Sequence, residues 1–221
     1  MASPTSHAVI LANGYPPPKG LLSKHLTDAG SLVCADGGAN TAARFGLTPD
    51  LIIGDLDSIL QQTIKKFSGV TARRIADQNS TDLEKALTWL IRKGFRDIRI
   101  FGATGGRLDH TIGNLSALAK YSRKARISMY DLDGDITYVG SDLTFEAPLG
   151  TIVSLLPLTL CEGIITRGLK WELKYESLAL GQRESTSNVV VKSPVDIKVR
   201  RGTLLLFRLS EAAANRSRGK V

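Results

Sequence analysis

The stretch SLVCADGGANTAARFGLTPDLIIGDLDS, residues 31–58, contains the pattern that decides the fold. It begins with a short apolar run, turns at two glycines, continues with helical spacing and returns to a second apolar run, LIIG. A strand, a helix and another strand in this order form the βαβ unit of a parallel sheet. Asp55 and Asp57 follow LIIG directly, so two negative charges stand at the end of a buried strand.

The same alternation continues on both sides of this stretch. Six strands are predicted, at residues 8–12, 31–35, 51–54, 70–75, 98–101 and 125–130. The helices predicted between them cover residues 19–30, 38–46, 81–94 and 108–124. Such alternation predicts a mostly parallel sheet flanked by helices, with ligands bound at the carboxyl ends of the strands.

From Asp135 onward the helical spacing stops. Seven strand-like runs follow, at residues 136–140, 143–147, 151–158, 163–168, 187–193, 195–202 and 203–209. Short strands at this spacing predict an antiparallel sandwich. The predicted fold class is therefore α/β, with an N-terminal sheet-and-helix domain of residues 1–133 followed by a C-terminal all-β sandwich domain of residues 134–221.

The formal charge of +8 over 221 residues favours an anionic partner. No run of the sequence interleaves basic and aromatic residues, so we expect no nucleic acid and favour a phosphate-rich small molecule. The basic residues Arg216, Arg218 and Lys220 are expected to lie in a frayed C-terminal tail. His7 is expected in a frayed N-terminus.

The two cysteines, Cys34 and Cys161, lie far apart in the sequence, which argues against a disulfide framework or a cysteine metal site. A reducing cytoplasm is therefore the expected compartment. No apolar run approaches the roughly 20 residues that span a bilayer, and the first residues lack a basic segment followed by a long apolar one. We expect neither secretion nor a membrane span.

The two aspartates after LIIG suggest a metal site. On an extended strand, residues two apart point to the same side, so Asp55 and Asp57 would direct both carboxylates to one point. Mg2+ is the usual ion between such oxygen ligands. The alternative is structural, because Asp57 or Ser58 could cap a helix expected at residues 59–67.

A third acid, Asp82, is expected at the same edge of the sheet, because it follows the strand at 70–75 and begins a helix. Thr81 and Glu84 have the spacing of a capping box, and a helix N-terminus favours a negative charge, so Asp82 also has a purely structural explanation. Three carboxylates at one edge nevertheless favour a metal site over three unrelated caps.

Glycine-rich turns follow two of the predicted strands, at residues 35–40 and 102–110. Glycines let a backbone approach phosphates closely, a helix N-terminus offers free N–H groups, and Arg107 adds a guanidinium. Neither the P-loop pattern nor G-x-G-x-x-G occurs in the sequence, which excludes an ordinary P-loop enzyme. His110 is expected to be a helix-surface or packing residue.

Six blocks occur in a specific order along the chain: ADGGAN, PDLIIGDLDS, QNSTDLEKAL, GATGGRLDH, GLKW and STSN. Together they resemble the thiamine pyrophosphokinase family. The resemblance extends from Ala35 to Asn188 and includes the change from α/β to all-β, so it covers most of the chain.

The resemblance implies an enzyme that transfers the pyrophosphoryl group of ATP to the hydroxyl of thiamine, giving thiamine diphosphate and AMP. It implies Mg2+ bound by Asp55, Asp57 and Asp82, with these three and Asp109 as catalytic residues. By the same resemblance the nucleotide side would consist of Asp36, Gly37, Gly38, Asn40, Thr81 and Arg107. Thiamine would be bound by Gln78, Trp171, Ser187 and Asn188.

The blocks GLKW and STSN lie in the predicted β domain, which in this family completes the thiamine pocket in a homodimer. Trp171 would offer an aromatic face to the cationic thiazolium, although by pattern alone a tryptophan in a β domain is expected in the core. One alternative is a related pyrophosphokinase acting on a pterin-type hydroxymethyl heterocycle, and another is a non-catalytic nucleotide-binding regulator. The thiamine-side blocks disfavour the first, and the intact acids disfavour the second.

Overall fold

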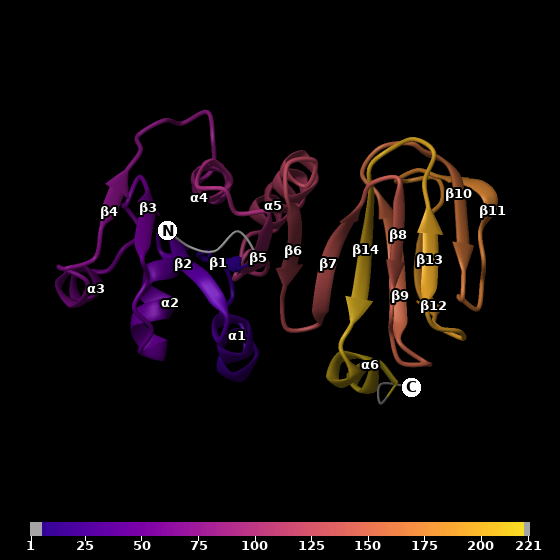
Figure 1. Cartoon of the computed structure of the whole chain (residues 1–221), viewed down its shortest axis with the longest axis horizontal. Helices are drawn as coiled ribbons and strands as arrows, with labels where there is room; N and C mark the ends of the chain where they lie inside the picture. Colours follow the sequence, from indigo (N-terminus) through magenta and orange to yellow (C-terminus); the bar gives the residue numbers. More distant parts are fainter. Residues whose placement is uncertain (1–5, 219–221) are drawn as a thin grey trace. The chain divides into compact units, whose positions relative to one another are not determined.

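The computed structural model describes residues 6–218, with side chains described for residues 6–216. The chain divides into two compact units, Met1–Asp131 and Leu132–Val221, which we call unit 1 and unit 2. Unit 1 combines parallel strands with helices, whereas unit 2 is built mainly from antiparallel strands (Figure 1). The predicted fold class is confirmed.

The sheet of unit 1 has the strand order β6-β5-β1-β2-β3-β4, and every neighbouring pair is parallel. Its strands are β1 (His7–Leu11), β2 (Ala29–Ala35), β3 (Leu51–Gly54), β4 (Ala72–Arg74), β5 (Asp97–Phe101) and β6 (Arg126–Tyr130). The central strand β1 is buried along its whole length. Its unbroken apolar run is typical of a parallel strand covered on both faces.

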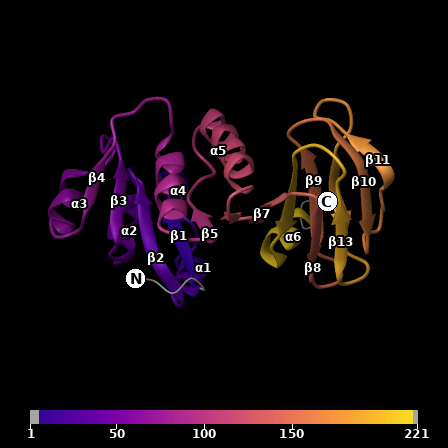
Figure 2. The same cartoon turned by 45° about the horizontal axis from the view of Figure 1, so that its top comes forward.

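The helices of unit 1 cover both faces of this sheet. They are α1 (Lys19–Leu26), α2 (Gly38–Phe45), α3 (Gln61–Lys66), α4 (Asp82–Arg92) and α5 (Leu108–Tyr121). Strands β2 to β4 add on one side of β1, and β5 and β6 add on the other. Because crossovers between parallel strands are right-handed, this reversal puts α1 to α3 on one face and α4 and α5 on the other (Figure 1). Figure 2 shows α4 and α5 side by side.

The reversal of strand order places a topological switch point between β1 and β5, where open α/β sheets bind ligands. α4 begins where the sequence predicts: the Thr81 hydroxyl accepts from the Glu84 amide, and the Glu84 carboxylate accepts from the Thr81 amide. The capping box is therefore confirmed. The predicted helices all form but end earlier than the sequence suggested. α2, for example, ends at Phe45, because Gly46 has a φ of 72°, a left-handed conformation that favours glycine.

Unit 2 is a sandwich of two antiparallel sheets, with strand orders β12-β9-β14-β7 and β11-β10-β13-β8. Its strands are β7 (Gly134–Val139), β8 (Asp142–Phe145), β9 (Ile152–Pro157), β10 (Cys161–Arg167), β11 (Lys174–Leu178), β12 (Ser185–Val189), β13 (Val195–Lys198) and β14 (Leu204–Leu209). Alternate residues of both sheets meet in the core, for example Val153 and Leu155 of β9 with Val195 and Ile197 of β13.

Two expectations about the chain ends are wrong. His7 is 8% exposed, begins β1, and has its Nε2 2.6 Å from the carbonyl oxygen of His25, so it is not frayed. Residues Glu211–Arg218 form the helix α6, and the Arg216 guanidinium pairs with Asp133, 2.7 Å away. The predicted tail is therefore helical up to Arg218, and Lys220 lies outside the described residues. Within residues 6–218, no helix is long and apolar enough to cross a membrane.

Candidate functional site

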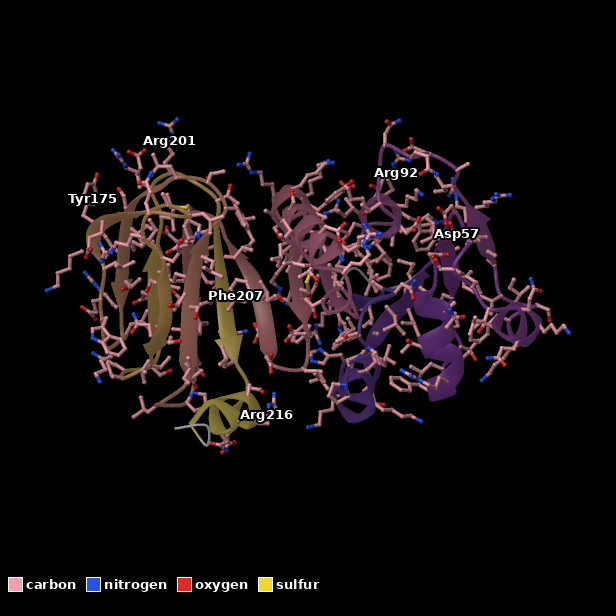
Figure 3. The ribbon with its side chains drawn as sticks, turned by 180° about the vertical axis from the view of Figure 1, so that it is seen from behind. Asp57, Arg92, Tyr175, Arg201, Phe207 and Arg216 are labelled. Carbon is pink, nitrogen blue, oxygen red and sulfur yellow. The ribbon has the colours of Figure 1, made fainter. Side chains whose placement is uncertain are left out.

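An acidic group lies at the carboxyl ends of β2 and β3. Asp36, Asp55 and Asp57 each offer one carboxylate oxygen, and the three oxygens lie within 4.8 Å of one another. Asp36 is 4% exposed, whereas Asp57 is exposed. Figure 3 labels Asp57 in this part of unit 1. Three hard oxygen donors without a nitrogen or sulfur partner are the donor set that Mg2+ prefers.

The backbone that brings these carboxylates together is not the one expected. β3 ends at Gly54, and Leu56 has a φ of 67°, so Asp55 and Asp57 do not lie on an extended strand. The turn at Leu56 is closed by the Asp57 amide, which donates to the Asp55 carboxylate at 3.3 Å. Asp36 also has a positive φ, 44°. Non-glycine residues in this region are uncommon and cluster at functional sites.

Asn40 holds the loop that carries the two aspartates. Its Nδ2 donates to the Ser58 carbonyl at 2.9 Å, and its Oδ1 accepts from the Leu60 amide at 3.0 Å. Asn40 therefore fixes the position of the acidic loop relative to α2. The structural alternative for this loop is wrong, since α3 begins after Leu60 with no side-chain cap, and neither Asp57 nor Ser58 caps it.

Burial controls the protonation of Asp36. Desolvation raises the pKa of the Asp36 carboxyl above its usual value, the nearby Asp82 adds to this, and hydrogen bonds from Ser58 and the Gly37 amide oppose it. A bound cation would relieve both the burial cost and the repulsion between neighbouring acids.

Asp82 lies beside this group without belonging to it. Its carboxylate accepts from Lys85 Nζ at 2.9 Å, and Lys85 is 7% exposed. A Cβ placed on Gly54 would lie 3.0 Å from Asp82 Oδ1 and 3.0 Å from the Cβ of Asp36. Asp82 and Asp36 therefore approach each other across a glycine that leaves room for both. The sequence reasoning overlooked Lys85 and assigned Asp36 to the nucleotide side only.

Two glycines after β2 allow α2 to approach the end of β1. A Cβ on Gly38 would lie 1.9 Å from the Leu11 carbonyl oxygen, and one on Gly37 would lie 2.4 Å from the Asn13 side chain. Neither position has room for a side chain. The amide groups at the start of α2 thus stand next to the loop that follows β1.

That loop, after β1, was missed by the sequence reasoning. The Gly14 amide donates to the Gly102 carbonyl at 2.6 Å, and the Tyr15 amide donates to Thr104 at 2.9 Å, so the loops after β1 and β5 are joined at the switch point. A Cβ on Gly105 would lie 2.4 Å from the Tyr15 ring. The signal for this site was Asn-Gly directly after the first apolar run.

Arg107 and Asp109 lie at the start of α5, next to this junction. They form an exposed ion pair, and the hydrogen bond from Arg107 lowers the pKa of the Asp109 carboxyl below its usual value. A carboxylate with a lowered pKa is a weak proton acceptor. His110 is exposed on α5, as expected for a helix-surface residue.

Trp171 is not a core residue. Its side chain is 56% exposed, and Lys170 Nζ lies 4.7 Å from its ring centroid. Asn188, only 2% exposed, accepts from the Trp171 amide at 3.1 Å and donates to its carbonyl at 2.7 Å. The expectation from pattern alone is wrong because the buried amide of Asn188 holds the Trp171 backbone at the surface of unit 2.

A pocket of about 260 Å³ lies against Trp171, and Asn188, Glu172 and Glu184 also line it. Ser187 is exposed and has a φ of 56°, with its amide donating to Ser154 Oγ at 3.0 Å. It does not line this pocket. Gln78 is exposed on the loop before α4 in unit 1.

Comparison with known proteins covers both units. Residues 22–130 match the family model for the thiamin pyrophosphokinase catalytic domain, and residues 142–204 match that for the thiamin pyrophosphokinase vitamin B1 binding domain. Thiamine pyrophosphokinase 1 of Oryza sativa is 31% identical over 195 residues, 75% of this chain and 74% of its own length. The Bacillus subtilis thiamine pyrophosphokinase is 30% identical over 184 residues, 80% and 86% of the two chains. The crystal structure of a Bacillus subtilis thiamine pyrophosphokinase aligns with a TM-score of 0.83 and 26% identity, covering 93% of this chain and all of that one.

Proposed function

The chain belongs to the thiamine pyrophosphokinase family, and from this premise we propose which of its residues perform the reaction. The enzyme transfers the pyrophosphoryl group of ATP to the hydroxyl of thiamine, giving thiamine diphosphate and AMP. The observation that carries the assignment is the convergence of Asp36, Asp55 and Asp57 at the ends of β2 and β3.

The acidic group would hold Mg2+, because its three carboxylates converge and the most buried of them has its pKa raised by desolvation. Asp82 is the candidate for a further carboxylate ligand, since it lies against Gly54 next to Asp36. When bound, Mg2+ would neutralise phosphate charge on ATP. Lys85 pairs with Asp82 at 2.9 Å and so fixes the position of this carboxylate.

The nucleotide would bind where the loops after β1, β2 and β5 meet. Gly37 and Gly38 let the start of α2 pack against the end of β1, so its backbone amides lie at this junction, and Arg107 can grip a phosphate once it leaves Asp109. Thr81 keeps its role at the start of α4 through the capping box. In this assignment Asn40 positions the acidic loop.

Thiamine would bind to the pocket against Trp171. The exposed face of the indole and the carboxylates of Glu172 and Glu184 suit a cationic thiazolium. Two hydrogen bonds made by the Asn188 side chain hold the Trp171 backbone in place. Ser187 and Gln78 are candidates for contacts with the pyrimidine. The match of residues 142–204 to a vitamin B1 binding domain favours thiamine over a pterin.

The reaction needs positioning and charge neutralisation more than a strong base. The hydroxyl oxygen of thiamine forms a bond to the β-phosphorus of ATP and releases its proton to water. The bond from that phosphorus to the bridging oxygen of the α-phosphate breaks, and AMP leaves with that oxygen. Such transfers pass through a loose transition state, so fixed charges do most of the work. In this scheme Asp109 holds Arg107 at the start of α5 until a phosphate takes its place.

The assignment is tested by product formation and by metal binding together. AMP production from ATP and Mg2+ is measured with thiamine, with a hydroxymethyl pterin and with neither, and we expect AMP only with thiamine. Calorimetric titration with Mg2+ should show a site in the native protein that is lost in Asp55→Asn and Asp57→Asn. If both variants bind Mg2+ with the native affinity, the acidic group is not the metal site.

We further propose a homodimer in a reducing, cytoplasmic compartment. The family resemblance supports the dimer, and two buried free cysteines, Cys34 and Cys161, support the compartment. Burial raises the pKa of the Cys34 thiol to about 12, which keeps it unreactive. Sedimentation of the full chain should give the mass of two copies, and a single-copy mass at micromolar concentration would refute the dimer.

A further inference from the structure

A pocket in unit 1 lies between α4 and the edge strand β4, and we call it the α4–β4 groove. Its volume is about 430 Å³, within the range of small-molecule sites. The residues that matter for its chemistry are Arg73, Ile75, Lys85, Trp89, Arg92 and Lys93. None of the three converging aspartates of the acidic group lines it.

The groove exists because one face of the sheet is incompletely covered. Ile53 of β3 is paired in register with Arg73 of β4, so both side chains lie on the same face of the sheet. α4 packs on β3 on this face. Within the described residues β4 is the edge strand of this sheet, so the floor formed by Arg73 and Ile75 is open on its far side.

Three cations from two elements converge on this space. Arg73 comes from β4, and Arg92 and Lys93 come from the end of α4. In the part of the chain with described side chains, no carboxylate forms an ion pair with any of the three. Figure 3 labels Arg92 on α4.

The remaining charges of the groove are already engaged. Lys85 is neutralised by Asp82, and the rim carboxylate of Asp77 accepts hydrogen bonds from Asn79 and Ser80. Those bonds lower the pKa of the Asp77 carboxyl, so it stays ionised at neutral pH. The groove therefore presents three cations without a carboxylate partner among the described side chains, and a single carboxylate at its rim.

One wall of the groove is aromatic. Trp89 is half-buried, and Lys93 Nζ lies 5.5 Å from its ring centroid. Planar arginine side chains bind phosphate through two parallel hydrogen bonds, and an indole stacks on flat rings. We propose that the α4–β4 groove is a second binding site, for a phosphate ester that carries a flat ring, the chemical class of a nucleoside monophosphate.

The test uses fluorescence of Trp89. The chain has two tryptophans, so Trp171→Phe leaves Trp89 as the single emitter. Titration of this variant with AMP, without Mg2+, should give a saturable change in emission. Adding Arg73→Ala and Arg92→Ala should weaken AMP binding about tenfold or more. Arg123→Ala, which removes an exposed arginine outside the groove, is the matched control and should leave the affinity unchanged.

Adenosine separates the two parts of the ligand, because it has the ring and lacks the phosphate. We expect it to bind at least about tenfold more weakly than AMP. An absent emission change, equal affinities for AMP in the double-arginine variant and the Arg123→Ala control, or equal affinities for AMP and adenosine would each overturn the proposal. The test reads binding alone, so it is independent of the assignment of the reaction site.

Discussion

Two asparagines perform the same task in the two units, at sites of opposite character. Asn40 ties the acidic loop of unit 1 through its amide, and Asn188 ties the Trp171 segment of unit 2 in the same way. In unit 1 the loop held in place carries Asp55 and Asp57 next to Asp36, a carboxylate that is 4% exposed, whereas in unit 2 the segment held in place carries an indole that is 56% exposed.

The two sites differ in which side chain is buried. In unit 2 the polar anchor, Asn188, is buried and the indole of Trp171 is at the surface. In unit 1 the anchor, Asn40, is near the surface and the carboxylate of Asp36 is buried. Desolvated charges interact strongly with ions, while an exposed aromatic face is available to a flat cation. The arrangement in unit 1 would suit binding of a metal ion and phosphates, and the arrangement in unit 2 would suit binding of a flat cationic substrate.

The largest expected effect would break the unit 1 half of this comparison. Asp57→Asn and Asp55→Asn should lower the rate of AMP production by about 100-fold or more, because each removes a charge that positions the metal-bound phosphates. Thermal unfolding should change little, since no core contact is lost. Asp28→Asn, an exposed acid outside the group, is the control. Rates within tenfold of native for both variants would exclude the acidic group from catalysis.

Substitution of the two asparagines would sharpen the comparison directly. Asn188→Ala removes a buried side chain and leaves partly buried backbone groups of Trp171 and Val189 without its hydrogen bonds, and should lower the free energy of unfolding by about 2 kcal/mol. Asn40→Ala, nearer the surface, should cost about 1 kcal/mol or less but reduce kcat. Chemical denaturation and initial rates measure both. Equal stability losses would mean that burial of the anchor does not distinguish the sites.

Trp171→Ala tests whether the exposed indole recognises thiamine. The KM for thiamine should rise by about 0.5–2 kcal/mol, expressed as a free energy, while the KM for ATP stays near native. Each substrate is varied with the other saturating. Parallel changes in both constants would assign Trp171 a structural role only. Trp171→Phe, which keeps an aromatic face, should recover part of the affinity.

The smallest effect concerns a carboxylate of unit 1 that is structural. Burial alone would raise the pKa of Glu84, but hydrogen bonds from Lys120 and the Thr81 amide outweigh it and lower that pKa below its usual value. A pKa that is lowered in the folded state stabilises the fold at pH values above the unfolded-state pKa. This stabilisation is lost as the pH falls through the folded-state pKa. Glu84→Gln should therefore cost about 1 kcal/mol of unfolding free energy at pH 7.

The same variant should match native stability in strong acid, where Glu84 is protonated in both folded and unfolded chains. Denaturation curves from pH 7 down to about pH 3 measure the convergence. A constant difference across this range would show that the charge of Glu84 does not contribute.

Local patterns predicted most of the fold. The six strands of unit 1 and the capping box at Thr81 follow from apolar runs and side-chain spacing. β11 was missed because its residues, KYESL, are mostly polar and exposed, so the strand shows no apolar alternation. α6 was missed because a short basic and alanine-rich end resembles a tail until tertiary contacts such as Arg216 to Asp133 hold it.

The site was harder to predict than the fold. The motif order indicated the three aspartates Asp55, Asp57 and Asp82, but the structure groups Asp36 with the first two and pairs Asp82 with Lys85. That regrouping depends on positive φ angles at Asp36 and Leu56, which residue type alone does not indicate. The role of Asn188 likewise depends on a long-range contact. Sequence patterns do not determine local backbone turns or contacts between residues that lie far apart in the chain.

β4 (Ala72–Arg74) also affects how the protein behaves in crowded solution. An edge strand with free backbone groups is a template on which the sheets of other molecules can assemble into aggregates. β4 is only three residues long, is exposed throughout, and carries two adjacent guanidinium groups. Its shortness gives an incoming strand few partners, and its charge repels a second copy of the same edge. We therefore expect the arginines of β4 to disfavour edge-to-edge pairing between copies of unit 1 at this strand.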